Sequence, residues 1–449
     1  MMTATMVKMT SAVAAKTMSR MSDTSFLEKD GKTLLTAKLQ ALLDEADEFV
    51  FLKGDYFSGP LFLHSDMEVK FEAGARIHLI DDESMFFKIP TRIAGIDMEG
   101  YPALLNLIDV RNVVLSGHGE VIGHGSKWYR KYWGDDKKGG MRKEYDAKGL
   151  RFACDYDCSR PKNILVQNSE DVNISDLTLR DSPFWNLHVL YSKNIVLDGL
   201  CILADDPDGP STDGIDIDSS QDVEISHCSI STNDDCISLK SGRDQDGIDR
   251  GIPTKHVHIH DCSILHGYGI SIGSELSAGI EDVLVENVSF SMSDCGFRIK
   301  SSKNRKGYVR NVLMRHVSLK DVRYPFYCYL DWNRMYNANV LPEDYKGVIP
   351  PYWKKLLACT DPMIKDTCVE NLSFEDVSIS YQETPASESC LYTFNGFENG
   401  VMAKIRFSDI RGVAGEYGTF ANCRDVVHEK EDVRILHEDR TVPGSFDNR

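Results

Sequence analysis

Thr212-Asp-Gly-Ile-Asp-Ile217 is the first of four similar short segments that follow one another before residue 301. The other three are Asp234-Asp-Cys-Ile-Ser-Leu239, Gly267-Tyr-Gly-Ile-Ser-Ile272 and Asp294-Cys-Gly-Phe-Arg-Ile-Lys300. Each alternates apolar and polar residues, which is the pattern of a strand with one buried face. Because the segments recur every 22 to 33 residues with the same alternation, they indicate stacked repeats.

A second pattern extends the repeat over most of the chain. An aliphatic residue is followed by apolar residues two, five and seven positions later, as in Val172-Asn-Ile-Ser-Asp-Leu-Thr-Leu179. The pattern begins again at Ile195, Val223, Val257, Val283, Val312, Leu372 and Ile405, and a related form begins at Val113. Loops of different length must leave the repeat, since successive spacings from Val172 to Val312 vary between 23 and 34 residues. We therefore predict an all-β fold, a single-stranded parallel β-helix of about ten turns. The alternative, a β-sandwich of short strands, does not explain the fixed register.

The repeat divides the chain into three parts. We expect a disordered leader at 1–21, a β-helix catalytic domain at 22–423 and a polar tail at 424–449 that is loosely held. The end of a solenoid exposes its apolar cross-section, and leucines at near-helical spacing in 32–46 predict a helix that caps the N-terminal end. Insertions at 128–158 and 324–367 are predicted to build a binding cleft.

Composition excludes several classes of partner. The net charge is −18, which argues against nucleic acid, because such binding rests on basic side chains that neutralise phosphates. No apolar run approaches the ~20 residues that would span a bilayer. The apolar stretch at 10–15 is too short for a signal peptide, so we expect a cytoplasmic protein, with secretion as the alternative. The cysteines are spread singly apart from Cys154 and Cys158, and predict neither a disulfide framework nor a metal site. No metal or cofactor is predicted.

Stacking places carboxylates together. Equivalent residues of neighbouring rungs lie roughly 4.8 Å apart, so Asp213, Asp235 and Tyr268 should share a column, with Asp234 beside it. The alternation also points Asp216 outward, and on the last segment it points Arg298 and Lys300 outward on the same face. Such a wall suits hydrolysis of a glycosidic bond in an acidic sugar. One carboxylic acid protonates the leaving oxygen, another carboxylate activates water, and the cations bind the sugar carboxylate.

Other interpretations of these residues remain open. Asp and Gly are common in turns for purely structural reasons, and the shared register of the four segments is the argument against that interpretation. Asp213, Asp216, Asp234 and Asp235 could instead ligate calcium, as in a β-helix polysaccharide lyase whose base would be Lys240 or Arg298. A non-catalytic carbohydrate-binding solenoid is the third alternative.

The motifs resemble those of glycoside hydrolase family 28, the polygalacturonases and their relatives. The matching residues are Ser211-Thr212-Asp213-Gly214, Asn233-Asp234-Asp235, Gly267-Tyr268-Gly269 and Arg298-Ile299-Lys300. The resemblance covers most of the chain and implies a right-handed parallel β-helix that hydrolyses galacturonate-containing pectic polymers or oligomers with inversion. It also implies that Asp234 is the general acid and that Asp213 and Asp235 activate the water. Arg298 and Lys300 would bind a galacturonate carboxylate.

Two departures from the family pattern stand near the acids. Ser211 replaces an Asn, and Tyr268 replaces a His, although a phenol, unlike an imidazole, does not titrate near neutral pH. They point to a divergent, bacterial-type member acting on rhamnogalacturonan or on oligosaccharide ends, with Tyr268 and Asp216 contacting substrate. The Gly273-Ser274-Glu275 run resembles exo-acting bacterial members, and by analogy we expect a monomer.

Overall fold

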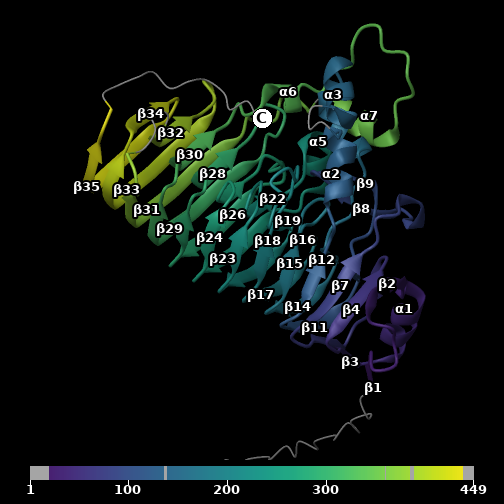
Figure 1. The fold of residues 1–449 in the computed structure, drawn as a ribbon. Helices are drawn as coiled ribbons and strands as arrows, with labels where there is room; N and C mark the ends of the chain where they lie inside the picture. The colour runs from purple at the N-terminus through teal and green to yellow at the C-terminus, as the bar shows by residue number, and fades with distance from the viewer. Residues whose placement is uncertain (1–19, 136–138, 359, 385–388, 438–449) are drawn as a thin grey trace, which may run out of the picture.

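The computed structural model describes residues 20–135, 139–358, 360–384 and 389–437. Within them the chain forms the predicted parallel β-helix, seen from the side in Figure 1. One wall is a parallel sheet of 11 strands. Its strands are β5 (Leu61–Leu63), β10 (Leu105–Ile108), β13 (Ile164–Gln167), β16 (Leu187–Leu190), β19 (Ile215–Asp218), β22 (Ile237–Lys240), β25 (Ile270–Ile272), β28 (Cys295–Lys300), β30 (Tyr324–Tyr329), β32 (Cys390–Asn395) and β34 (Glu416–Ala421).

The remaining walls belong to a sheet of 22 strands. They are β1 (Met21–Asp23), β2 (Asp30–Leu34), β3 (Glu48–Phe51), β4 (Gly54–Ser58), β6 (Met67–Phe71), β7 (Ala75–Leu79), β11 (Arg111–Gly117), β12 (Glu120–Ile122), β14 (Glu170–Ser175), β15 (Thr178–Arg180), β17 (Lys193–Asp198), β18 (Cys201–Leu203), β20 (Gln221–Ser226), β21 (Ser229–Ser231), β23 (Thr254–His260), β24 (Ser263–His266), β26 (Ile280–Glu286), β27 (Ser289–Ser291), β29 (Tyr308–Lys320), β31 (Cys368–Ser380), β33 (Val401–Ala414) and β35 (Arg424–Ile435).

The aliphatic anchors of the sequence repeat form one continuous ladder. Each anchor pairs with the equivalent anchor of the next rung, without a slip in register, from Val113 to Ile405. All of these side chains are buried in one core that runs the length of the helix. Because side chains alternate along a strand, this register sends the intervening polar residues outward.

Left-handed residues lie directly before the anchors, at bends within these strands. Asp282, Asn311 and Asn371 have φ of 57°, 58° and 59°, a conformation that Asn and Asp tolerate better than other non-glycine residues. Their side chains also bond along the stack: Asn311 Nδ2 donates to Asp282 Oδ1 (2.9 Å) and Asn371 Nδ2 donates to Asn311 Oδ1 (2.8 Å). The turn chemistry of the sequence therefore stabilises the stacking of rungs as well as each turn.

The N-terminal end is capped as predicted, by a shorter helix. Helix α1 spans Thr36–Glu45 and buries Leu39 and Leu43 against the core, whereas the start of the predicted segment belongs to β2. The predicted leader lies outside the described residues except for its last two, and Met21 begins β1.

The predicted loose tail is wrong for Arg424–Ile435. This segment forms β35, which pairs in parallel with β33 and continues the anchor ladder through Val426. Its charged side chains are mostly exposed because β35 is the last rung of its sheet among the described residues. The sequence of a terminal rung is thus polar, although its backbone pairs with the preceding rung. The rest of the predicted tail, from 438, lies outside the described residues.

Short helices and a hairpin cover one stretch of the 11-stranded sheet. They are η1 (Glu83–Met85), the antiparallel pair β8 (Ile89–Ile93) and β9 (Ile96–Gly100), α2 (Ser126–Trp133), α3 (Gly140–Ala147), η2 (Arg151–Ala153), α4 (Cys154–Asp157), α5 (Asp244–Arg250), α6 (Arg334–Asn337) and α7 (Pro351–Leu357). Figure 1 shows the labelled helices of this group together beside β16, β19 and β22. Both predicted insertions contribute, although the second begins with a strand of the repeat, β30. A second apolar cluster, which includes Ile93, Phe152 and Trp353, holds the group together.

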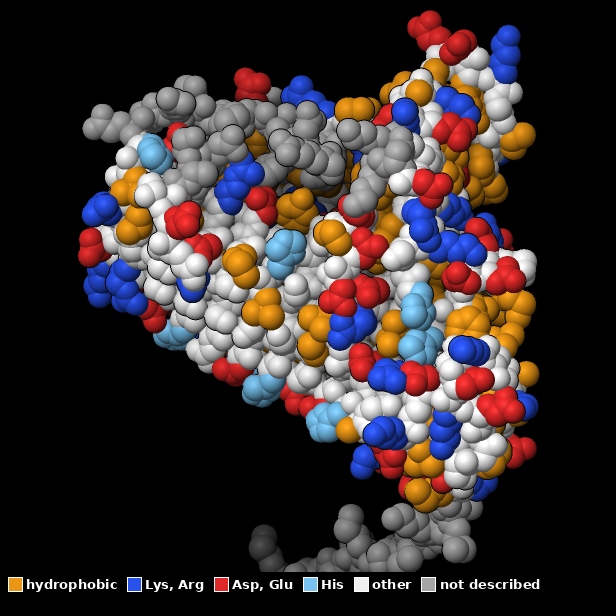
Figure 2. Space-filling view, viewed as in Figure 1, with side chains coloured by type: hydrophobic (Ala, Val, Ile, Leu, Met, Phe, Trp, Pro, Cys, Tyr) orange, Lys and Arg blue, Asp and Glu red, His pale blue; other side chains and the backbone are white. Residues whose placement is uncertain are grey.

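The surface is charged without a dominant patch in the view of Figure 2, where acidic and basic side chains are interspersed. Among the described residues, no helix combines the length and the apolar character needed to cross a bilayer.

Candidate active site

Three carboxylates meet where two neighbouring strands of the 11-stranded sheet begin. Asp213 precedes β19, and Asp234 and Asp235 precede β22, which pairs with β19 in register. One oxygen from each of the three lies within 4.8 Å of the others. Asp234 is half-buried, whereas Asp213 is 3% and Asp235 0% exposed. Asp234 therefore offers the most accessible carboxyl group of the three.

Asp235 is held by two cations from a strand two rungs away. Arg298 Nη2 lies 2.5 Å from Asp235 Oδ1, and Lys300 Nζ lies 2.7 Å from Oδ2. Ser271, on the intervening strand β25, donates to Oδ1 at 2.7 Å. All four side chains are buried. The side chains of Arg298 and Lys300 therefore point outward as predicted, and both contact the same carboxylate.

Asp213 faces a different cation, Lys240 at the end of β22. The Lys240 ammonium lies 3.6 Å from Asp213 Oδ2, 3.4 Å from Asp216 Oδ1 and 3.7 Å from Glu275 Oε2, and 4.9 Å from the centre of the Trp185 ring. Asp216 points outward as predicted but is 0% exposed, because the covering segments bury it. The predicted contact between Asp216 and substrate would therefore require the Asp216 side chain to become exposed.

These surroundings give adjacent carboxyl groups opposite proton affinities. Burial raises the pKa of Asp234 above its usual range, and the negative charge of Asp235 raises it further. Burial would also raise the pKa of Asp235, but Arg298 and Lys300 outweigh it and hold that pKa well below the usual range. Burial, followed by the neighbouring Asp234 and Asp216, raises the pKa of Asp213. The site can thus hold a proton on one carboxyl while another stays ionised.

Tyr268 lies next to the acids, as its register predicts. Its backbone N–H donates to the Asp234 carbonyl (3.0 Å), and its ring stacks 4.7 Å from the Arg298 guanidinium. Burial raises the pKa of Tyr268 to about 12. The phenol therefore remains protonated near neutral pH and can act only as a hydrogen-bonding group.

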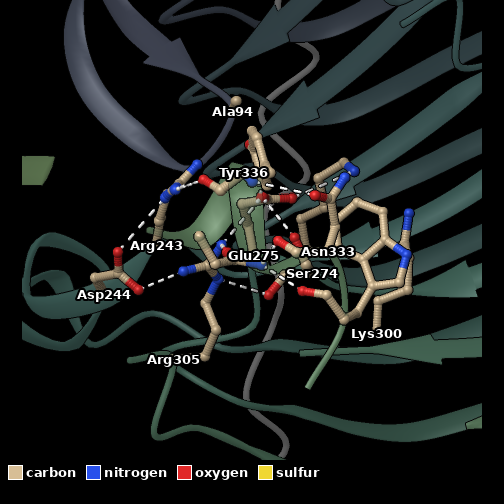
Figure 3. A network of polar contacts seen from close by, with 12 residues as sticks. Ala94, Arg243, Asp244, Ser274, Glu275, Lys300, Arg305, Asn333 and Tyr336 are labelled. Carbon is tan, nitrogen blue, oxygen red and sulfur yellow. Dashed lines mark hydrogen bonds and ion pairs between the residues drawn. The ribbon is translucent and has the colours of Figure 1, made fainter. Parts of the chain in front are cut away.

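A network of buried polar side chains forms a wall beside Lys300, shown in Figure 3. Its Glu275 also lies 3.7 Å from the Lys240 ammonium. Glu275 accepts from Ser274 Oγ (2.8 Å) and from the Tyr336 hydroxyl (3.1 Å). Arg243 donates to the Tyr336 carbonyl (3.0 Å), and its own backbone N–H donates to Gly95, at the turn between β8 and β9 (2.9 Å). The wall therefore ties segments that lie far apart in sequence to the rim of the site.

A second link in this wall involves Arg305, which donates to the Ser274 carbonyl (2.9 Å), to Asn337 Oδ1 (2.6 Å) and to Asp244. Trp332, from the loop before α6, covers the Lys300 ammonium at 4.8 Å. The insertion thus supplies one side of the site, and Arg305 anchors it.

The sequence repeat predicted that Asp213, Asp234, Asp235, Tyr268 and the Arg298–Lys300 pair lie together, and the structure places all of them in one cluster. The repeat did not assign Glu275 or Trp332 to the site, and Lys240 was expected only as a candidate base for a lyase. Lys240 could have been recognised from the sequence, because the alternation of β22 points its side chain outward. The same holds for Asp218, its paired residue on β19. The positions of Glu275 and Trp332 depend on loops and carry no such periodic signal.

The three acids also have the spacing of a cation site, which the calcium alternative requires. The partners of Asp235 argue against that alternative. Both oxygens of Asp235 are already bound to Arg298, Lys300 and Ser271, so this carboxylate has little capacity left for a metal. The donor set is therefore a poor fit for calcium, which binds six to eight oxygens.

Comparison with known proteins agrees with the fold and the motifs. The chain is 31% identical over 314 residues to a probable polygalacturonase of Vitis vinifera, covering 66% of this chain and 60% of that protein. It is 27% identical over 293 residues to an endo-polygalacturonase of Pectobacterium carotovorum subsp. carotovorum, covering 64% and 67%. A family 28 exopolygalacturonase structure from Yersinia enterocolitica superposes with a TM-score of 0.71 at 21% identity, covering 93% and 79% of the two chains.

Coverage of these relatives is partial. The matched region spans 60% of the grape protein and 40% of a probable polygalacturonase from Arabidopsis thaliana. The family model described as glycosyl hydrolases family 28 matches residues 52–342, a range that includes all three acids, Tyr268, Arg298 and Lys300. This chain therefore belongs to glycosyl hydrolases family 28.

Proposed function

We propose that this protein is a glycoside hydrolase that cleaves α-galacturonosidic bonds in pectic polymers or oligomers. The observation that carries the proposal is that, of the adjacent carboxyl groups of Asp234 and Asp235, only Asp235 is paired with the two cations of β28. The pKa values of the two groups therefore shift in opposite directions. General acid catalysis needs a carboxyl that keeps its proton, and activation of water needs a negative charge nearby. The names of the relatives, polygalacturonases of plants and bacteria, support galacturonate as the sugar.

In the proposed mechanism Asp234 protonates the glycosidic oxygen as the bond to the anomeric carbon breaks. A water held between Asp213 and Asp235 adds to that carbon, and its proton passes to Asp213. Asp213 must be ionised to accept this proton, and its raised pKa makes the ionised form the stronger base. Activity should therefore fall as the pH rises through the pKa of Asp234, since the acid then loses its proton.

The charge balance supports an acidic substrate. Arg298 and Lys300 together carry two positive charges, of which Asp235 neutralises one. The remaining charge can attract a uronate carboxylate in a chain that is otherwise strongly acidic, with a net charge of −18.

We propose that the reaction inverts the anomeric configuration. One oxygen from each of the three carboxyl groups lies within 4.8 Å of the others, whereas whole carboxyl groups are roughly 6.5–9.5 Å apart in inverting enzymes. Retention, however, would need one carboxylate to attack the sugar. Asp235 is fully buried with both oxygens bound, which favours water as the nucleophile.

Proton NMR of the first-formed product on polygalacturonate and its oligomers tests this mechanism. We expect the anomer opposite to that of the substrate bond. A retained configuration, or a trapped covalent glycosyl-enzyme, would refute inversion while leaving the hydrolase assignment intact.

We further propose exo action, on chain ends. The buried wall that links Glu275, Arg243 and Tyr336 stands beside the acids and supports a site that is closed on one side. Product analysis on polygalacturonate and rhamnogalacturonan distinguishes the modes. Release of a single small product from the start indicates exo action, and a ladder of intermediate lengths indicates endo action.

A further inference from the structure

A second cavity lies apart from the acids, between the β8–β9 hairpin, α5 and α7. Its volume is about 610 Å³, within the roughly 300–1,000 Å³ of typical small-molecule sites. Its floor includes Gln167 and Tyr191, which lie at or just beyond the carboxyl ends of β13 and β16. The catalytic carboxylates, by contrast, precede the amino ends of β19 and β22. The cavity therefore lies along the edge of the 11-stranded sheet where its strands end, and the acids lie along the edge where its strands begin.

A buried ion-pair chain separates the cavity from the outward face of β19. Arg92, which is 0% exposed, bonds to Asp218 on β19 (2.8 Å) and to Asp97 on β9 (2.9 Å). The Tyr191 hydroxyl donates to the same Asp97 (2.5 Å). These contacts fix the floor of the cavity and neutralise Asp97, one of the two acidic residues that line it.

The lining carries cations with unused hydrogen-bonding capacity. The exposed Arg250 guanidinium stacks 4.3 Å from the Tyr191 ring, and within the part of the chain that the structure describes it has no hydrogen-bond acceptor or ion-pair partner. The exposed Lys88, across the cavity on the β8 side, is likewise without one among those residues. A third cation, Lys355 on α7, is paired with Asp246 (2.8 Å). Stacking holds the Arg250 fork in place, which lowers the cost of binding a planar anion such as a carboxylate.

The rest of the lining suits a sugar ring. Pro90, Met98, Pro351 and the half-buried ring of Tyr352 provide apolar surface. Two buried polar atoms of lining residues, Thr91 Oγ1 and Gln167 Oε1, have no hydrogen-bond partner among the described residues, although Gln167 Nε2 donates to the Pro90 carbonyl (3.1 Å). Apolar faces next to unsatisfied polar groups and free cations match a polyhydroxylated, anionic ligand.

We propose that this cavity is an accessory binding site for an acidic sugar, a uronate mono- or disaccharide whose carboxylate is held by Arg250 and Lys88. The choice of a uronate rests on the proposed function, because the substrate and product of that reaction are acidic sugars. Such a site would retain a pectic chain, or a released fragment, on the enzyme without taking part in bond cleavage.

Calorimetric titration of the full-length Asp234→Asn variant with digalacturonate tests the proposal. This variant should cleave the sugar very slowly, so binding can be measured before much of the sugar is hydrolysed. We expect two binding events per chain. Arg250→Ala in the same background should remove one event or weaken it at least tenfold, and Lys88→Ala should weaken the same event.

Lys354→Ala is the matched control, because Lys354 is an exposed cation on α7, a helix beside the cavity, and does not line the cavity itself. It should leave both events in place. Neutral galactobiose should not bind at the Arg250 site, and added salt should weaken digalacturonate there. Thermal unfolding of each variant shows that it is folded.

A single binding event that Arg250→Ala leaves unchanged, two events that survive Arg250→Ala, or equal binding of galactobiose would each overturn the accessory site. The proposed function fails by a separate measurement, namely wild-type protein that releases no galacturonate from any pectic substrate. The loss of a binding event on Arg250→Ala decides the accessory site in either case.

Discussion

At the scale of single residues, the site depends on how two neighbouring aspartates are partnered. Asp234 and Asp235 are adjacent in sequence, yet only Asp235 reaches the cations of β28. Both residues lie in the bend before β22, where the regular alternation of a strand does not apply, so their different partners follow from the local backbone of that bend. The pKa of Asp234 is therefore raised, whereas that of Asp235 is lowered.

Asp234→Asn should lower kcat by about 10²–10⁴-fold or more, because the amide cannot donate a proton as an acid does. Affinity for a pectic oligomer should change little, since Asn preserves shape. Kinetics together with calorimetry check both quantities. Glu68→Gln, which neutralises an exposed carboxylate on β6, is the control and should match wild type. Near-normal turnover by Asp234→Asn would exclude Asp234 as the acid.

Asp216 should make the folded protein less stable as the pH rises, which is the opposite of the usual effect of a carboxyl group. Burial raises its folded-state pKa from the usual 3.8 to about 8, although Lys240 opposes the shift. Between these two pH values the folded state keeps a proton that the unfolded state has lost, so its contribution to stability falls as the pH rises.

Asp216→Asn should abolish this loss. Relative to wild type, the variant should gain up to about 1.4 kcal/mol of unfolding free energy for each pH unit from about 4 to 8. Urea unfolding at a series of pH values measures the difference. A difference that stays constant with pH would show that Asp216 is ionised in the folded protein.

At the scale of elements, the stack is held by side-chain ladders as well as by the core. Asn311 sits between Asp282 and Asn371, and bonds to both while its own backbone is left-handed. Its contribution therefore has two parts, one from the backbone conformation and one from the side-chain hydrogen bonds.

Substitution of Asn311 separates the two parts. Asn311→Ala should cost about 2–3 kcal/mol, the sum of roughly 1–2 kcal/mol for Ala in the left-handed region and about 1 kcal/mol for lost hydrogen bonds. Asn311→Gly should cost less, because glycine adopts this φ without strain. Denaturant unfolding of both variants provides the comparison. Equal costs would mean that the backbone conformation contributes nothing.

At the scale of the whole molecule, the choice between hydrolase and lyase depends on whether the acid cluster works with protons or with a metal. The oxygens of Asp235 are bound to protein cations, so exhaustive chelation should leave the rate of cleavage unchanged. The products should lack the unsaturated, ultraviolet-absorbing sugar end that elimination creates. Loss of activity on chelation, restored by calcium, together with an unsaturated product would establish the lyase alternative.

Local alternation of apolar and polar residues was enough to predict the repeat, its register and the outward direction of the site residues. Because the anchors pair rung by rung, Asp213, Asp235 and Tyr268 can be aligned by their spacing from the strands that follow them. The strand β35 escaped prediction because a terminal rung has exposed charges and so lacks the apolar alternation on which the prediction relied.

Which charges meet depends on contacts between distant rungs, and these could not be predicted from alternation. Arg298 and Lys300 lie 63 and 65 residues from Asp235, and Lys240 on β22 meets Glu275, which follows the neighbouring strand β25. The covering segments then bury Asp216, which strand parity alone had placed outward. Periodicity specifies the direction of a side chain from its own strand. Burial and pairing depend on loops of irregular length that fold over from distant parts of the chain, and these set the proton affinities on which the chemistry rests.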